Sequence, residues 1–426
     1  MNLLPAPSFR FIRAASALAC LTSITAVAQT FSPLTPGFWP SSISDDGQTI
    51  AGTKTSNSYS APPVVWSQAN GFTEMEAFPT DGNFLRHYLT ELSGDGSTAV
   101  GIATWGAGTV NSRSAGFRWT AETGTVGIGH LSEDVSSEAA AVSANGRVVV
   151  GVSFPLRRAT ENYTPQAIRW TPETGVVGLG SLGTPGTHSD NSEATGVSAD
   201  GSVVVGKSNG QVFRWTEETG MQGLGFGGSG IKISPDGTAI AGWGFDNEPF
   251  RWTEDLGLIP LGNPDLTAGS GGRILAMNFD GSLIIGSSFD NLNRLYPFIW
   301  SPTSGLRDLR TVLDDVFGLE DELAGWGNLI PSDLSTDGRY LIGRGTNPFG
   351  QSQSWLIDLG ENYGPIPPGV DPELPPYIRP VPEPSTYGAI AAGALVALIF
   401  MRRRRAHSIA GDKVTALHPT APLAEI

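Results

Sequence analysis

The sequence has little cysteine and histidine, and each shortage excludes a class of chemistry. The single cysteine among 426 residues, Cys20, lies in a segment that we expect to be removed, so neither disulfides nor a thiolate site is available to the mature chain. The five histidines do not have metal-ligand spacing, and no phosphate loop, zinc signature or Gly-x-Ser-x-Gly elbow occurs. We therefore predict a non-enzymatic protein with no metal ion and no cofactor.

Basic residues are also scarce relative to acidic ones. The chain has 26 Lys and Arg against 41 Asp and Glu, which gives a net charge of −15. Between residues 29 and 380 the imbalance is 38 acidic to 19 basic residues. Such a surface repels a phosphate backbone, so we do not expect nucleic acid as a partner.

Long hydrophobic runs occur only near the two ends. Residues 1–28 combine Arg10 and Arg13 with an apolar stretch and a small-residue site, Ala26-Val27-Ala28, before Gln29. This pattern predicts a secretory signal peptide over residues 1–28, with Ala26 and Ala28 before the cleaved bond and Gln29 after it. The alternative is a lipoprotein site at Cys20.

The rest of the chain is rich in glycine and is organised by a repeat. Seven copies contain an Asp-Gly or Asn-Gly pair, a second glycine five residues later, a tryptophan, and another glycine five residues after it. The first glycines are Gly47, Gly96, Gly146, Gly201, Gly237, Gly281 and Gly338. The tryptophans are Trp66, Trp119, Trp170, Trp215, Trp252, Trp300 and Trp355.

Each repeat has the chemistry of β-strands, with short runs of Val, Ile and aromatic residues bounded by Gly, Asp and Ser. Four antiparallel strands in about 48 residues form a propeller blade. We predict an all-β, seven-bladed β-propeller over residues 29–362. An N-terminal strand, 30–34, is expected to complete the last blade beside strand 354–359 and remove its open edge. A β-helix and a two-domain sandwich are the rival folds.

Variation in loop length predicts the binding face. The second-to-third strand connections and the links between blades vary, and both emerge on one face of the disc, which we call the long-loop face. The candidate binding residues there are Trp105, Tyr163, His188 and Trp243. The repeated tryptophans are expected in the core between blades, whereas Trp105 and Trp243 lie outside that register and are expected to be exposed. Residues 309–331 predict a short amphipathic helix that caps a blade seam or the channel, rather than a ligand lid.

The C-terminal part divides into three segments. Residues 363–381 form a proline-rich linker that favours extended polyproline geometry. Residues 382–405 contain Pro382, Glu383 and Pro384, an apolar stretch from Tyr387 to Met401 and a basic cluster. Residues 406–426 are expected to form a disordered tail. The apolar stretch predicts a single hydrophobic anchor helix, with the arginines on the cytoplasmic side of the membrane.

Two family resemblances follow from these motifs. The segment from Pro382 onward resembles a PEP-CTERM sorting signal, whose elements here are Pro382, Glu383, Pro384 and the cluster Arg402, Arg403, Arg404 and Arg405. The resemblance implies a Gram-negative bacterium, an exosortase-type enzyme as partner, transient anchoring in the inner membrane through 387–401, and release to the cell surface or extracellular matrix. Gly116-Phe117-Arg118-Trp119 and its counterparts resemble the HAF family of extracellular repeats without their histidine, a resemblance that implies no activity.

Two functions are compatible with these features. The preferred one is a non-enzymatic surface or matrix protein whose propeller binds exopolysaccharide or an envelope protein. The alternative is an extracellular enzyme that acts on glycans, with carboxylates such as Asp134, Glu138, Asp190 or Glu193 near the variable face. Because glycoside chemistry needs two carboxylates at a defined separation, paired buried carboxylates at the channel mouth would favour the enzyme.

Overall fold

The computed structural model describes residues 29–55, 63–78, 85–105, 113–156, 163–244, 248–262, 271–289 and 294–360. The expected signal peptide 1–28, linker 363–381, sorting and anchor segment 382–405 and tail 406–426 lie outside the described residues. No helix within the described ranges is long and apolar enough to cross a membrane.

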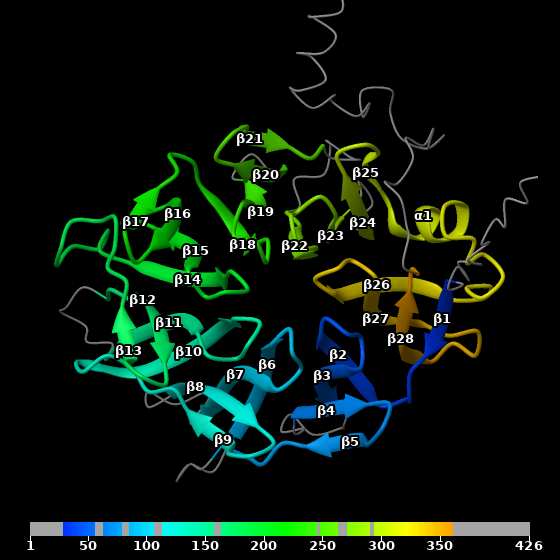
Figure 1. Ribbon diagram of the computed structural model, residues 1–426, viewed down its shortest axis with the longest axis horizontal. Coiled ribbons are helices and arrows are strands. Elements are labelled where there is room, and N and C mark those ends of the chain that lie inside the picture. The colour runs from blue at the N-terminus through cyan, green and yellow to red at the C-terminus, as the bar shows by residue number, and fades with distance from the viewer. Residues whose placement is uncertain are drawn as a thin grey trace, which may run out of the picture.

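Seven four-stranded antiparallel sheets form a ring, as the sequence predicts (Figure 1). Blades 1 to 3 are β2(Phe38–Ile43), β3(Thr49–Lys54), β4(Pro63–Ser67) and β5(Gly71–Glu74); β6(Leu85–Leu92), β7(Thr98–Trp105), β8(Arg113–Thr120) and β9(Gly124–Gly127); and β10(Asp134–Val142), β11(Val149–Pro155), β12(Gln166–Thr171) and β13(Gly175–Gly178). Blades 4 and 5 are β14(Ser192–Val197), β15(Val203–Ser208), β16(Gln211–Thr216) and β17(Gly220–Gly223); and β18(Gly228–Ile233), β19(Ala239–Gly244), β20(Pro249–Thr253) and β21(Gly257–Pro260). Blades 6 and 7 are β22(Arg273–Met277), β23(Ile284–Phe289), β24(Leu295–Ser301) and β25(Gly305–Asp308); and β26(Gly327–Leu334), β27(Tyr340–Thr346), β28(Ser352–Asp358) and β1(Thr30–Pro33).

The N-terminal strand closes the ring, and this prediction is confirmed. Strand β1 pairs antiparallel with β28, with Thr30 opposite Asp358 and Pro33 opposite Trp355. The Phe31 ring meets the Trp326 ring edge-on, with 4.9 Å between the centroids. Blade 7 is therefore assembled from both ends of the described chain, and β28 has no open edge.

The first glycine of each repeat is required by the inner hairpin. All seven adopt a positive φ, between 65° and 78°, which only glycine adopts at little cost. In blade 4 the Gly201 N–H donates to the Ser198 carbonyl, and Asp200 accepts from the Ser198 hydroxyl and the Ser202 N–H. The repeated aspartates thus have a turn-forming contact, as the sequence indicates.

The second glycine of each repeat is required for a different reason. The inner strand of every blade has a register shift, of the kind a β-bulge produces, against its neighbour. Near this irregularity a carbonyl points at the glycine: a Cβ added to Gly151 would lie 1.9 Å from the Glu138 carbonyl oxygen. The same contact occurs at Gly101 with Tyr88 and at Gly206 with Glu193. Only a residue without a side chain fits there.

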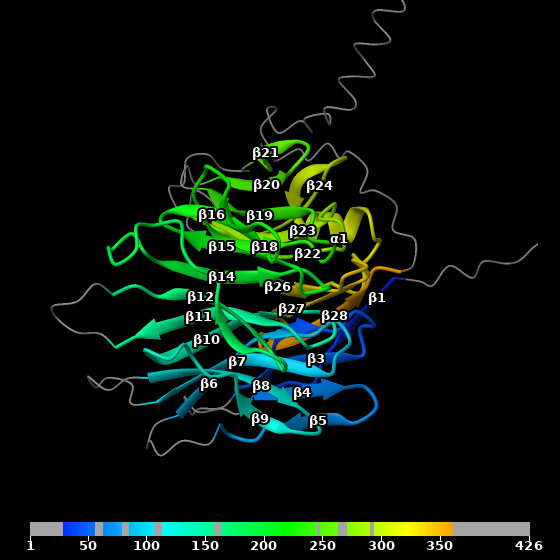
Figure 2. The same ribbon diagram turned by 60° about the vertical axis from the view of Figure 1, so that its left-hand side comes forward.

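The core lies between the blades, whose sheets stack face to face (Figure 2). Each of seven hydrophobic clusters includes, or packs against, one tryptophan of the repeat, so the expected core role of these residues is confirmed. The arginine before the tryptophan reaches the next blade. Arg118 Nε donates to the Gly146 carbonyl and Arg251 Nε to the Gly281 carbonyl. Packing and hydrogen bonds therefore join consecutive blades.

The predicted amphipathic helix is present but short. Helix α1(Leu309–Asp315) is capped by Asp308, whose side chain accepts from the Thr311 N–H, and the chain after the helix turns back into β26. Its buried residues pack in a cluster with Ile299 of blade 6 and Trp355 of blade 7. The helix thus caps the seam between blades 6 and 7, at the outer side of the disc (Figure 1).

Candidate functional site

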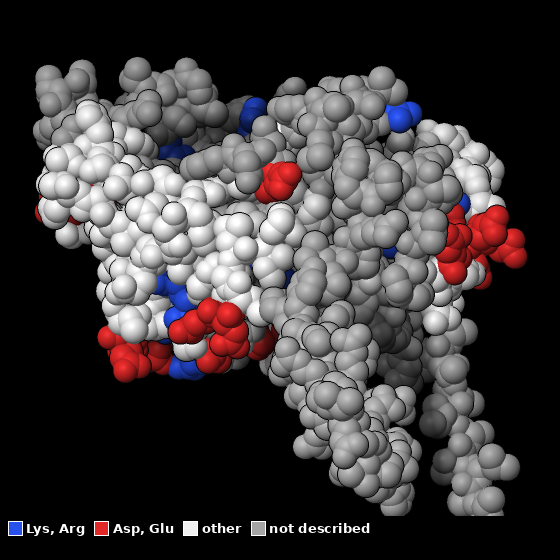
Figure 3. All heavy atoms as spheres, turned by 90° about the horizontal axis from the view of Figure 1, so that it is seen from above, with Lys and Arg blue, Asp and Glu red and all other residues white. Residues whose placement is uncertain are grey.

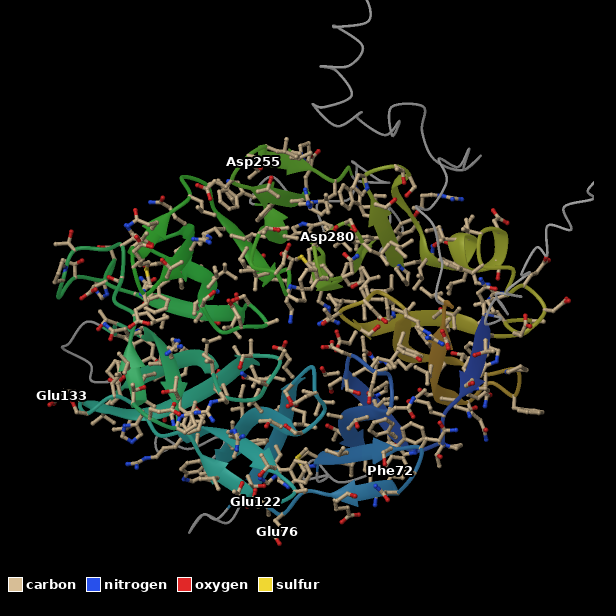
Figure 4. The ribbon with its side chains drawn as sticks, viewed as in Figure 1. Phe72, Glu76, Glu122, Glu133, Asp255 and Asp280 are labelled. Atoms are coloured by element: carbon tan, nitrogen blue, oxygen red, sulfur yellow. The ribbon has the colours of Figure 1, made fainter. Side chains whose placement is uncertain are left out.

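A ring of hydrogen bonds surrounds one end of the central channel. Each inner hairpin reads Ser-x-Asp-Gly, with Asn in place of Ser or Asp in two of the copies. The N–H of residue x, or of the residue after it, donates to the carbonyl of residue x in the next blade. The successive N–H to carbonyl bonds are Asp45 to Gly94, Asp95 to Ala144, Ala144 to Ala199, Ala199 to Pro235, Asp236 to Phe279 and Phe279 to Thr336. The Thr336 N–H closes the ring on the Asp45 carboxylate at 3.3 Å. In Figure 4, Asp280 in one of these hairpins lies near the middle of the disc, whereas Glu122 and Asp255 lie at its rim.

Inside this ring the channel has a small cavity of about 100 Å³. One position of the inner strands, two before the hairpin serine or asparagine, contributes to its wall. The residues at this position are Ser42, Glu91, Ala141, Gly196, Lys232, Ala276 and Asp333, and all of them except Ala141 and Gly196 line the cavity. Three of them are ionisable and the others are small. No charged group was predicted here from the sequence, although aligning the seven copies at this position shows the three ionisable residues.

Asp333 is bound into the seam between blades 7 and 1. One of its carboxylate oxygens, Oδ2, accepts from the Ser42 hydroxyl at 2.7 Å and from the Ile43 N–H at 3.0 Å. The Ser42 hydroxyl in turn accepts from the Leu92 N–H of blade 2. Burial raises the pKa of the Asp333 carboxyl, and these hydrogen bonds act in the opposite direction. Asp333 is therefore a structural link as well as a charge in the channel.

Glu91 is the second carboxyl group of the channel. Its Oε2 atom is buried and has no hydrogen-bond partner among the described residues. Burial raises the pKa of Glu91 to about 7, the Lys232 charge lowers it, and the Asp333 charge raises it. Near neutral pH this carboxyl is thus divided between its protonated and ionised forms, because burial disfavours the charged form.

The raised pKa of Glu91 predicts a stability that falls as the pH rises. Between pH 4.5 and about 7 the folded protein holds a proton on Glu91 that the unfolded chain releases. This difference stabilises the folded protein by about 3 kcal/mol below pH 4.5. The stabilisation is lost as the pH rises from 4.5 to about 7. We expect Glu91→Gln to flatten the pH dependence of the unfolding free energy between pH 5 and 7, measured by urea denaturation. Equal slopes for the two proteins would contradict a buried, protonated Glu91.

The four residues predicted for the binding face have different environments. Trp105, at the end of β7, is half-buried and stacks on Phe78, with 6.3 Å between the centroids. Tyr163 is half-buried and stacks on Phe154, and His188 is exposed. Their roles in binding stay predictions.

Trp243 is not the exposed platform that the sequence suggests. Its side chain is only 3% exposed and belongs to the cluster between blades 5 and 6. It follows the second glycine of its repeat, Gly242, within strand β19, and a Cβ on Gly272 would lie 2.5 Å from its ring. A tryptophan that lies outside the repeated positions is therefore not necessarily exposed, because β19 places the Trp243 side chain between two sheets.

Exposed aromatic residues occur instead on the inner strands. The residue five before the hairpin serine or asparagine is at the same level in every blade, towards the long-loop face. Across the blades it is Trp39, Tyr88, Glu138, Glu193, Ser229, Arg273 and Ile330. Trp39 is 47% exposed and Tyr88 is 48% exposed. The sequence analysis missed both residues.

Two of the four carboxylates considered for catalysis lie in neighbouring blades. Glu138 of β10 and Glu193 of β14 occupy equivalent positions, and burial together with the Glu193 charge raises the pKa of Glu138. Glu193 forms an ion pair with Lys207 at 3.1 Å. Asp190 accepts from the Ser181 hydroxyl and the Gly186 N–H, which fixes its own loop. Asp134 begins β10 opposite Pro155.

A larger pocket, of about 520 Å³, lies on the long-loop face beside α1. The residues around it come from blade 6, from α1 and from the start of β26, the end of β27 and the start of β28. Its apolar wall includes Leu295, Pro297 and Leu329, and its polar groups include Asn328 and Arg344. Asn328 has a φ of 49°, a conformation that is uncommon outside glycine. We call this the blade 7 pocket.

The blade 7 pocket differs in charge from the rest of the protein. Its walls contain Arg310, Arg344 and Asp308, in a chain whose acidic residues outnumber basic ones by 41 to 26. Carboxylates form several groups on the side of the disc shown in Figure 3. The pocket therefore has two arginines in its walls, one of which, Arg310, is paired with Asp314.

Comparisons with known proteins give a sorting motif and a fold. Residues 380–405 match the PEP-CTERM protein-sorting motif, which implies an exported protein of a Gram-negative bacterium that an exosortase processes. No curated protein sequence matches the chain. The match to the motif covers only this C-terminal segment.

Several solved propellers are similar to the chain at low identity. An oligogalacturonate lyase from Vibrio parahaemolyticus has 13% identity and a TM-score of 0.45, covering 80% of this chain and 99% of that one. The Cps50 β-propeller domain of Myceliophteria thermophila has 11% identity and a TM-score of 0.48, covering 77% of this chain and 99% of that one. TolB from Acinetobacter baumannii has 13% identity and a TM-score of 0.39, covering 75% of this chain and 65% of that one. None of these likenesses transfers a function to this chain.

Proposed function

We propose that this protein is a non-enzymatic, exported binding module that binds a polysaccharide at the cell surface or in the extracellular matrix. The observation that carries the proposal is the blade 7 pocket on the long-loop face. Its volume of about 520 Å³ lies within the range of small-molecule sites, roughly 300–1,000 Å³. Apolar side chains beside hydroxyl and amide groups suit a sugar, which has apolar C–H faces and polar edges.

The sorting motif supports the location of this module. In the proposal an exosortase-type enzyme recognises Pro382, Glu383 and Pro384, and the stretch 387–401 holds the chain in the inner membrane until it is released. The repeats, which resemble the HAF family, then form the exported domain. The proline-rich linker holds the propeller away from the membrane surface during this step.

Replacing Pro382, Glu383 and Pro384 by alanine is expected to keep the protein in the membrane fraction at its unprocessed mass. The unchanged protein is expected in the extracellular fraction, with an intact mass that ends close to Pro384. Mass spectrometry and fractionation of the native host measure both properties. Alanine at the arginines 402–405 tests the basic end separately. Unprocessed wild-type protein in the membrane would overturn release, and the propeller would then be an anchored receptor.

Binding itself is tested on a panel of neutral and acidic polysaccharides. We expect retention of the exported chain by at least one of them, and we expect Ser352→Trp, which places a large ring at the wall of the pocket, to abolish it. A tryptophan in place of Phe349, which is 87% exposed and outside the pocket, is the matched control. The absence of binding to every glycan would overturn the proposed function.

Glycan cleavage is a second candidate, because one observation favours it. The raised pKa of Glu138, next to the charge of Glu193, resembles the unequal carboxyl pair that glycoside hydrolysis uses. In that case new reducing ends would appear on incubation with a bound polysaccharide, and Glu138→Gln would stop their formation. Binding without new reducing ends favours the module over the enzyme.

A further inference from the structure

We propose that the blade 7 pocket selects anionic saccharides, through a two-point contact between the Arg344 guanidinium and a sugar carboxylate. The inference rests on the proposed function and names the class of ligand. It starts from the environment of Arg344 in β27, where this residue pairs with Ile330 on one side and Ser354 on the other.

The guanidinium of Arg344 is oriented by an aromatic ring and has no acceptor in the described part of the chain. It lies over the ring of Trp39 in blade 1, with its carbon 5.1 Å from the ring centroid. Neither a hydrogen bond nor an ion pair to the Arg344 side chain exists among the described residues. Other arginines differ: Arg339 forms a bidentate pair with Asp358, and Arg310 bonds to Asp314 and to two carbonyls. In a chain with an excess of carboxylates, this leaves Arg344 available to an external anion.

Stacking on Trp39 prepares the guanidinium for a carboxylate. The aromatic face takes up one side of the planar group and restricts its rotation, while its N–H groups point outward in the plane. A planar fork of donors fits the two oxygens of a carboxylate, and a bidentate contact of this kind is stronger than a neutral hydrogen bond. Trp39 is 47% exposed, so part of its ring is also available to a sugar.

The remaining walls suit a neighbouring residue of the same saccharide. Leu295 and Pro297, which belong to blade 6, offer apolar contact for the C–H face of a ring, and Asn328 and Ser352 offer polar groups for its hydroxyls. The nearby negative charge of Asp308 is engaged, since this residue accepts from the N–H and hydroxyl of Thr311 at the start of α1. Arg310 is paired with Asp314, so Arg344 is the arginine of the pocket whose donors have no acceptor among the described residues.

The test compares each acidic polysaccharide with its own carboxyl-reduced form. The probes are polygalacturonate, alginate and hyaluronan, each before and after reduction of the carboxylates to primary alcohols, which keeps the linkage and removes the charge. Affinity of the exported chain is measured by calorimetry. We expect at least one probe to bind, and its reduction to weaken binding by about 10- to 100-fold, the range of a charge-assisted contact. Added salt is expected to weaken only the charged form.

Variants separate Arg344 from general charge. Arg344→Gln is expected to weaken binding of the acidic form by the same factor and to leave the reduced form unchanged. Arg344→Lys is expected to recover only part of the loss, because an ammonium group lacks the planar fork. Arg147→Gln is the matched control: it removes the same charge from an exposed pair with Glu173, beside an inner hairpin away from the long-loop face. Melting curves confirm that each variant is folded, and Trp39→Ala, which removes the stacking surface, is expected to weaken binding in the same direction.

The outcomes distinguish the inference from the proposed function. Equal affinity for the acidic and reduced forms, or an unchanged affinity of folded Arg344→Gln, overturns the anionic preference and leaves a saccharide-binding module. Failure to bind acidic probes while a neutral glycan of the wider panel binds has the same meaning. Failure to bind any glycan overturns both.

Discussion

Gly151→Ala is expected to destabilise the propeller by about 4 kcal/mol or more, the size of a severe core defect. The added Cβ would lie 1.9 Å from the backbone carbonyl oxygen of Glu138, and a backbone atom cannot move aside as the end of a side chain can. Relief would require the register irregularity in β10 to be rebuilt, together with its contacts to blades 2 and 4. Chemical denaturation of the wild-type and variant proteins measures the difference.

The matched control is Gly327→Ala. An added Cβ at Gly327 meets nothing within 4 Å, and its φ is not in the positive range that disfavours alanine. We expect this variant to unfold with the wild-type protein. A Gly151→Ala protein of normal stability would show that the close approach of the carbonyl is not what requires glycine in the second strand.

Removal of residues 29–34 is the second change with a large expected effect. It deletes β1, half-buried Phe31 and buried Leu34, at a cost of about 5 kcal/mol or more from lost apolar burial and main-chain hydrogen bonds. It also leaves β28 as an open edge, which favours pairing with a second molecule. We expect a lower melting temperature and a dimer or larger assembly by light scattering.

Ser32→Ala is the control for this truncation, because Ser32 is exposed and the change keeps the main chain of β1 intact. It is expected to behave as the wild-type protein. If the truncated protein instead stays monomeric and melts at the wild-type temperature, three strands are sufficient for blade 7 and the closing strand is dispensable.

The repeat and its architecture could be predicted because local requirements recur. A positive φ at each inner hairpin selects glycine after Asp or Asn, and the tryptophan of each copy packs between sheets. These are properties of one blade, so seven copies reveal them. The closing strand was predictable for a related reason: a last blade with three strands needs a partner for its edge.

The candidate sites were less predictable because they depend on residues that differ between copies. Glu91, Lys232 and Asp333 meet only when the seven inner strands surround one channel, although they are far apart in the sequence. The contact of Arg344 with Trp39 joins blade 7 to blade 1 and has no counterpart in sequence spacing. Trp243 shows the converse, since its local pattern indicates exposure and the neighbouring blade buries it.

The position of β1 in the last blade has a consequence for how the chain folds. It is synthesised before every other strand and its partner β28 after all of them, and the hydrogen bond from Gln353 to the Leu34 carbonyl spans 319 positions. Contacts of such long range form slowly, since the ends of a long loop must first meet. Closure is therefore a late event, and until then the growing array exposes strand edges at both ends. The incomplete blade is the one that adjoins the C-terminal segment, so a molecule processed there before closure would be prone to association.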